Sequence, residues 1–277
     1  MAAIILALGA SLSYGLGDFL GGVSARRTHV LRVLAISQPF GAAIVVLWVV
    51  LADEPFLGTG ATLAAVGAGI GGVAGLAALY RGMAIGAMGV VAPISSMAAA
   101  IPFTVGLVRG ERPSVLQFAG AVVALGGLAL VSRTNDELQG RIAAGVGLAL
   151  LAALGFGLYF VLLDVAADES ASWAVLVARV SSSSLAVGAA LAAGVSLRLP
   201  RRLLLPVIGV GLCDVGANVL FALATTRGLV SVVSVLTSLY PAVTVILAAV
   251  LLHERLSGIQ LVGAAAVLAG AGLLTVG

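Results

Sequence analysis

Three ionisable side chains stand inside long apolar segments of the sequence, where a charge needs a protein partner, water or a ligand: Asp18, Arg179 and Asp214. Asp214 lies about midway along its segment, and Asn218 follows at the spacing of four that puts both on one face of a helix. Such a carboxylate can bind a substrate ammonium group or exchange a proton, or it can form a helix–helix hydrogen bond. We predict that Asp214 and Asn218 belong to a substrate or coupling site.

Asp18 and Arg179 are the other candidates for substrate binding or coupling. Asp18 shares a helical face with Tyr14 and Gly22, and this small, polar face suits a cavity or a close helix contact. Alternatively, its carboxylate reaches interfacial water or Arg26. Arg179 can pair with a carboxylate of the protein or of a substrate, or its long side chain can extend to the membrane interface.

Prolines and hydroxyl groups form a second group of candidates. The prolines are Pro93 and Pro102 in the fourth apolar segment and Pro241 in the ninth. Each removes a backbone hydrogen bond, which membrane helices tolerate where protein or water satisfies the freed carbonyl. We predict that these two segments carry a hinge or gate and line the path. The nearby candidate contacts are Ser96, Ser238 and Tyr240, although a serine in a helix more often bonds the carbonyl one turn back.

Membrane helices must position these side chains. Of the 277 residues, 61% are hydrophobic and only 9% are charged, and the mean hydropathy is +1.23. A soluble domain is about 45–50% apolar and about 25% charged, so soluble and disordered chains are excluded. Apolar segments of about 20 residues, long enough to cross a bilayer, lie at residues 3–25, 30–52, 61–80, 87–108, 114–131, 142–163, 173–197, 203–226, 229–252 and 257–276. The predicted fold class is an all-α integral membrane protein with ten transmembrane helices.

The two halves of the chain repeat each other. A shift of 143 residues lays ERPSVLQFAG (111–120) on ERLSGIQLVG (254–263), and a shift of 142 lays Tyr14-Gly15-Leu16 on Phe156-Gly157-Leu158. We predict five-helix repeats at 1–132 and 142–277, joined by a linker at 133–141. Because five is odd, the second repeat is inverted, as in secondary transporters whose site lies at mid-membrane between the repeats. Each Glu-Arg pair is predicted to be a structural turn, with Ser114 and Ser257 as helix N-caps.

The paired ERxSxxQxxG segments, each after a Pro-containing helix, resemble the EamA domains of the drug/metabolite transporter superfamily. YGLGDFLGG (14–22) and SLYPAVT (238–244) are also similar to segments of bacterial members. The resemblance covers essentially the whole chain. It implies ten helices in a bacterial inner membrane, no bound cofactor, and export or exchange of amino acids or other small metabolites or drugs.

A passive channel and an intramembrane enzyme are the alternatives to a transporter. A channel is more naturally a symmetric oligomer. An enzyme needs a nucleophile and a base that face each other, and the neighbours Cys213 and Asp214 do not on a helix. We predict a transporter without enzymatic activity, cofactor or metal, and scattered arginines argue against nucleic acid. Its expected partners are a small-molecule substrate, the lipid bilayer and protons, and its expected state is a monomer or weak dimer.

The arginines also predict the orientation. All fourteen basic residues are Arg. With ten helices, Arg109, Arg112 and Arg227 lie on the side of both termini, and ten others lie on the opposite side. The positive-inside rule then puts the termini outside the cell, whereas the family resemblance implies cytoplasmic termini. We follow the charge count, because it is a property of this chain.

Overall fold

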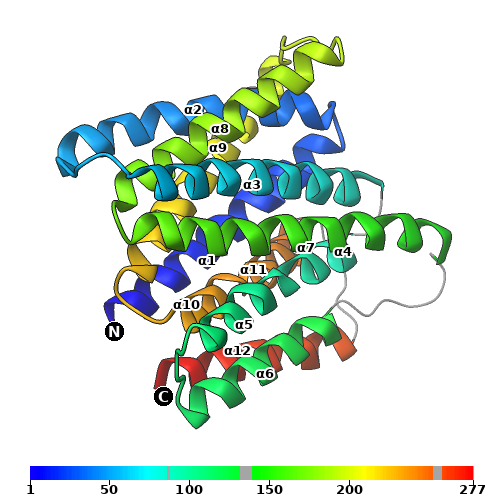
Figure 1. The fold of residues 1–277 in the computed structure, drawn as a ribbon. Helices are drawn as coiled ribbons and strands as arrows, with labels where there is room; N and C mark the ends of the chain where they lie inside the picture. Colours follow the sequence, from blue (N-terminus) through cyan, green and yellow to red (C-terminus); the bar gives the residue numbers. More distant parts are fainter. Residues whose placement is uncertain (86–87, 132–138, 252–257, 277) are drawn as a thin grey trace.

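The computed structural model describes residues 1–85, 88–131, 139–251 and 258–276, which form a bundle of helices without a β-strand (Figure 1). The first half contains α1 (Ala2–Ala25), α2 (Val30–Ala52), α3 (Thr59–Ile85), α4 (Met88–Ser96), the 3₁₀ helix η1 (Met97–Ala99), α5 (Ala100–Val108) and α6 (Val115–Val131). The second half contains α7 (Gln139–Ala167), α8 (Ala171–Ala192), α9 (Arg201–Thr225), α10 (Val230–Thr237), α11 (Tyr240–Leu251) and α12 (Gly258–Val276). The all-helical prediction is confirmed.

The helices have the length and composition that a bilayer requires. Within the described residues, six are long and apolar enough to cross a membrane, namely α1, α2, α3, α7, α8 and α9. Three shorter apolar stretches accompany them at Ile94–Val108, Val115–Gly127 and Val230–Thr244. This count of nine does not establish the ten expected spans, so the tenth stays a prediction.

Large apolar side chains face outward while small and polar ones lie inside. Leu47, Val50 and Leu205 are among the many exposed aliphatic residues, and the interior is rich in alanine, glycine and serine. This distribution suits a hydrocarbon solvent, in which close packing of small residues holds the helices together. The chain is a multi-pass membrane protein.

Several helix ends differ from the predicted boundaries. α3 continues through Arg81 to Ile85, past the predicted end at Tyr80, because the exposed Arg81 side chain lies beyond the apolar part of the helix. α8 ends at Ala192 rather than at residue 197. Gly194 has a φ of +63°, and the N–H groups of Gly194 and Val195 donate to the carbonyls of Leu191 and Ala190, which is a Schellman motif. α7 begins at Gln139, inside the predicted linker 133–141.

The packing between the halves comes in matched pairs. α1 packs on α9 as α7 packs on α3, and α2–α8 and α6–α12 each join equivalent helices of the two halves. Two glycines make equivalent close approaches: Gly69 lies against the Ala178 carbonyl and Gly211 against the Ser37 carbonyl. A side chain at either glycine would collide with backbone, so both crossings depend on the missing Cβ.

The fourth and ninth predicted segments are each broken in two. The fourth consists of α4, η1 and α5, and the ninth consists of α10 and α11, with Ser238 and Leu239 between them. Pro102 is the third residue of α5 and Pro241 the second of α11, where a missing N–H costs little. Pro93 instead lies within α4, which continues past it.

Candidate functional site

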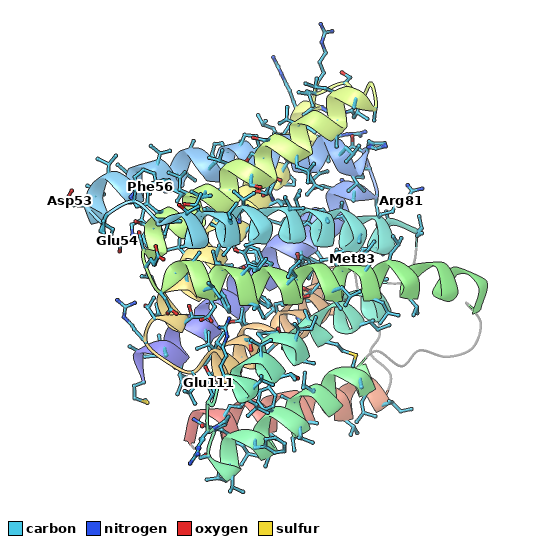
Figure 2. All side chains as sticks on the ribbon, in the orientation of Figure 1. Asp53, Glu54, Phe56, Arg81, Met83 and Glu111 are labelled. Carbon is cyan, nitrogen blue, oxygen red and sulfur yellow. The ribbon has the colours of Figure 1, made fainter. Side chains whose placement is uncertain are left out.

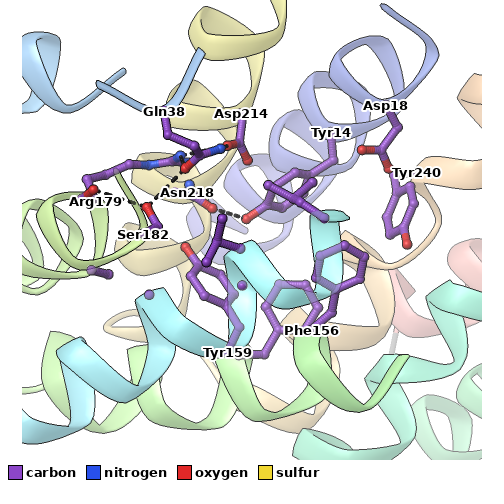
Figure 3. Close-up of a pocket in the computed structure, with 16 residues that line it drawn as sticks. Tyr14, Asp18, Gln38, Phe156, Tyr159, Arg179, Ser182, Asp214, Asn218 and Tyr240 are labelled. Carbon is purple, nitrogen blue, oxygen red and sulfur yellow. Dashed lines mark hydrogen bonds and ion pairs between the residues drawn. The ribbon is translucent and has the colours of Figure 1, made fainter. Parts of the chain in front are cut away.

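A cavity of about 530 Å³ lies inside the bundle, between the two halves of the chain. Side chains of α1, α2 and α3 from the first half and of α7, α8, α9 and α11 from the second line it (Figure 3). Tyr14, Gly72 and Asp214 are lining residues near the middle of α1, α3 and α9. The cavity therefore lies at about mid-height of the bundle, and its volume is in the range of small-molecule sites.

A buried polar network forms one wall of the cavity. The Arg179 guanidinium donates to Oδ2 of Asp214 at 2.6 Å and to Oε1 of Gln38 at 2.6 Å. The Gln38 amide donates to the same Asp214 oxygen at 2.9 Å, and Ser182 donates to Gln38 at 3.0 Å. Arg179 is only 4% exposed. Of the two predicted alternatives for Arg179, pairing with a protein carboxylate is therefore correct and extension to the interface is not.

Asp18 lies on the other side of the cavity, beside Tyr240 (Figure 3). It is 5% exposed, and within the described ranges no hydrogen bond or ion pair reaches its carboxylate. Arg26 is directed elsewhere, since its Nε donates to the Met83 carbonyl. The interfacial alternative for Asp18 is therefore excluded, and the carboxylate faces the cavity without a partner.

Aromatic rings form the remaining walls. The Tyr14 ring centroid is 6.1 Å from that of Tyr240 and 6.3 Å from that of Phe160, both in edge-to-face geometry. The Tyr14 hydroxyl donates to the Asn218 side-chain oxygen, and the Tyr240 hydroxyl is 2.9 Å from that of Ser95. These contacts hold the rings in place at the edge of the cavity.

Five of the seven predicted binding or coupling residues line this cavity: Asp18, Arg179, Asp214, Asn218 and Tyr240. Ser96 and Ser238 do not; both are fully buried next to the helix breaks. The three predicted hinge residues, Pro93, Pro102 and Pro241, are not lining residues either. Lining residues that the sequence analysis did not select include Gln38, Phe156, Tyr159, Phe160 and Ser182.

The lining residues occupy equivalent positions in the two halves. At a constant offset of 142 residues, a position that lines the cavity in the first half has a lining counterpart in the second. The pairs are Tyr14 with Phe156, Asp18 with Phe160, Gly72 with Asp214, and Leu76 with Asn218. The cavity is therefore symmetric in position but asymmetric in chemistry, because in three of the pairs one half supplies an ionisable or amide group and the other an apolar group or glycine.

A bundle of apolar helices built from two related halves around a central cavity has the architecture of a membrane transporter. The model of the EamA-like transporter family matches the sequence twice, at residues 1–133 and 143–276, and the chain belongs to this family. One crystal structure superimposes with a TM-score of 0.76 over 99% of this chain and 96% of the other, at 18% sequence identity, which supports the fold alone. No curated protein sequence matches the chain.

Proposed function

We propose that the chain is a secondary transporter with ten membrane spans in two inverted five-helix repeats, which carries a small molecule through the central cavity by alternating access. The observation that carries this proposal is the set of four paired lining positions offset by 142 residues. A site built from equivalent positions of inverted repeats can be exposed to either side when the repeats exchange conformations. The proposed location is the inner membrane of a bacterium.

Charged contacts between the halves join them at the end of the bundle that holds both termini (Figures 1 and 2). Glu54 accepts hydrogen bonds from the side chains of Ser170 and Ser172 at 2.5 and 2.8 Å. At the same end, Arg109 pairs with Asp164 at 3.1 Å. We infer that this end is closed in the present conformation and that these contacts separate when it opens.

The breaks between α4 and α5 and between α10 and α11 are the proposed hinges, with Pro102 and Pro241 beside them. Breaks in membrane helices concentrate bending at a few residues. Pro241→Ala, which favours a continuous helix, is expected to slow transport while leaving equilibrium binding unchanged. Pro206→Ala in α9 is the control, because this proline lies outside the breaks.

Transport by purified protein in liposomes tests the function. Uptake of radiolabelled amino acids and amines should saturate, and the unlabelled compound inside the vesicle should accelerate it by exchange. A channel would instead give flux that rises linearly and shows no exchange. Asp214→Asn should abolish or uncouple transport in folded protein, and unchanged transport kinetics would contradict its role.

Crosslinking tests the closed end separately. Cys213 is the single cysteine, so Cys213→Ala provides a cysteine-free background. A crosslink between Glu54→Cys and Ser172→Cys should stop transport, and reduction should restore it. Continued uptake with this end crosslinked would contradict alternating access at this end.

A further inference from the structure

The charges that line the cavity do not cancel. Arg179 and Asp214 neutralise each other, and Gln38 bonds to both. The remaining charged residue, Asp18, has no hydrogen bond or ion pair from the part of the chain that the structure describes, although it is almost entirely buried. An anionic Asp18 thus leaves one uncompensated negative charge. A carboxylate away from water is costly unless a cation or a proton joins it.

The surroundings of Asp18 are aromatic. Tyr240 lies directly beside it (Figure 3), and Tyr14 is one turn earlier on α1. Across the cavity, Phe156 and Phe160 extend this wall. The two tyrosine hydroxyls already have partners in Asn218 and Ser95, so the rings rather than the hydroxyls are what these tyrosines offer to a ligand. Aromatic rings next to a carboxylate attract organic cations, through cation–π interaction and charge pairing together.

We propose, on the premise that this cavity is the transport site, that its cargo is an organic monocation with an aromatic or apolar body, and that Asp18 binds its charge. An amine or quaternary ammonium group would sit between Asp18 and Tyr240. The apolar body would lie against Phe156, Phe160 and the helix α3 surface at Gly72.

An anionic cargo is poorly matched to the same cavity. Its natural partner would be Arg179, but Arg179 already donates to Asp214 and to Gln38, each at 2.6 Å. An anion would have to displace Asp214 and leave that carboxylate buried without its partner. It would also meet the negative charge of Asp18. The arrangement therefore selects against anions as well as for cations.

Three probes of similar size and different charge test the cation site. Benzyltrimethylammonium is the cation, neopentylbenzene is its neutral carbon isostere, and phenylacetate is an anion. Binding to purified protein in nanodiscs is measured by calorimetric titration. The cation is expected to bind at least about tenfold more tightly than the other two probes. Equal or weaker binding of the cation, or none, would overturn the proposal without any variant being needed.

Substitutions assign the selectivity to Asp18. Asp18→Asn keeps the side-chain size and removes the charge, so the affinity for the cation should fall about tenfold or more, to that for the neutral isostere. Asp18→Glu should retain the preference for the cation. The control Asp53→Asn removes an exposed carboxylate at a residue with a φ of 49°, which asparagine tolerates, and should change nothing. Undiminished cation binding by folded Asp18→Asn protein would refute the assignment.

Uptake into proteoliposomes separates this inference from the proposed function. Asp18-dependent binding of the cation without uptake of any compound would contradict transport and leave the cation site standing. Saturable uptake of neutral or anionic compounds that Asp18→Asn leaves intact would contradict the cation site and leave transport standing.

Discussion

The Nη1 atom of Arg179 lies 2.6 Å from Oδ2 of Asp214, and both side chains are almost completely buried in the bundle. The two residues come from the neighbouring helices α8 and α9 of the second half, and Gln38 of the first half donates to one and accepts from the other. The pair therefore fixes three helices at the level of the cavity. It also removes from the cavity the positive charge that Arg179 would otherwise supply.

Breaking this buried pair should cost far more stability than breaking an exposed one. Asp214→Ala leaves the Arg179 charge unpaired in the interior and is expected to lower the free energy of unfolding by about 3–5 kcal/mol. At the end of the bundle, Arg109 pairs with Asp164 with its side chain 43% exposed, so Arg109→Ala should cost only about 0.2–1 kcal/mol. Reversible unfolding in mixed micelles measures both losses.

The double variant Arg179→Met/Asp214→Leu provides the control for the buried pair. It removes both charges and keeps apolar volume, so it should recover most of the stability lost in Asp214→Ala. Similar losses for Asp214→Ala and Arg109→Ala would mean that the interior of this bundle is effectively hydrated, against the prediction.

Glu111 is expected to act as a helix cap rather than as a substrate ligand. Its carboxylate accepts the N–H groups of Val230 and Ser231 at 2.9 and 3.0 Å, in the first turn of α10. Glu111→Ala should therefore lower stability by about 1–2 kcal/mol and leave ligand affinity unchanged. Arg112→Ala, at an exposed neighbouring side chain, should have little effect. A selective loss of affinity at normal thermal stability would contradict this role.

The neighbouring turn confirms part of the structural role predicted for the Glu-Arg motif. Gly110 has a φ of +93°, and the Glu111 N–H donates to the Gly106 carbonyl, as a helix C-terminus requires. Ser114 then caps α6: its hydroxyl accepts the Gln117 N–H, and the Gln117 side chain accepts the Ser114 N–H. The second motif, at Glu254 and Arg255, and its Ser257 lie outside the described residues.

Glu54 should make stability depend on pH below neutrality. Partial burial by itself raises the pKa of Glu54, but hydrogen bonds donated by Ser170 and Ser172 outweigh it and hold the pKa below its ordinary value of 4.5. Because the folded-state pKa is the lower one, Glu54 stabilises the fold above the unfolded-state pKa. That contribution disappears as the pH falls through the folded-state pKa.

The measurement is the thermal stability of the native chain and of Glu54→Gln across this range. At pH about 7 the variant should be less stable, and the two curves should converge as the pH falls below about 4. Asp53→Asn, at the exposed preceding residue, should run parallel to the native chain. A constant difference between the native chain and Glu54→Gln at every pH would rule out the titration of Glu54 as its source.

Sequence reasoning identified the parts of the site that contrast with their surroundings. Asp18, Arg179 and Asp214 are conspicuous because charges are rare in an apolar segment, and the spacing of Asn218 from Asp214 followed from helix geometry. Phe156, Tyr159 and Phe160 offered no such contrast, because an aromatic residue in an apolar helix has the same composition whether it faces lipid or a cavity. Only the packing of α7 against α3 decides this.

The pairing of distant charges was equally out of reach of the sequence. Whether Arg179 meets a carboxylate depends on how α8 and α9 cross, and Gln38 enters the network from a helix more than a hundred residues away. Ser96 and Ser238 show the opposite error, because proximity to a helix break indicated a path that the cavity does not follow. The repeat, in contrast, was readable directly, and it contained the four paired lining positions before any of them was recognised.

The orientation of the chain is the last prediction, and it depends on charges at the two ends of the bundle. Arg81 lies at the end opposite to Glu54 and Glu111, so the acidic loops and the arginine-rich loops face different sides (Figure 2). Arg198, Arg201 and Arg202 belong with Arg81 by helix order. Positive-inside retention then puts these arginines in the cytoplasm and both termini outside. A C-terminal fusion to a reporter active only outside the cytoplasm should be active, and neutralising Arg198, Arg201 and Arg202 together should weaken this bias. Clear activity of a cytoplasm-only reporter in the native chain would show that family topology, rather than the arginine count, governs insertion.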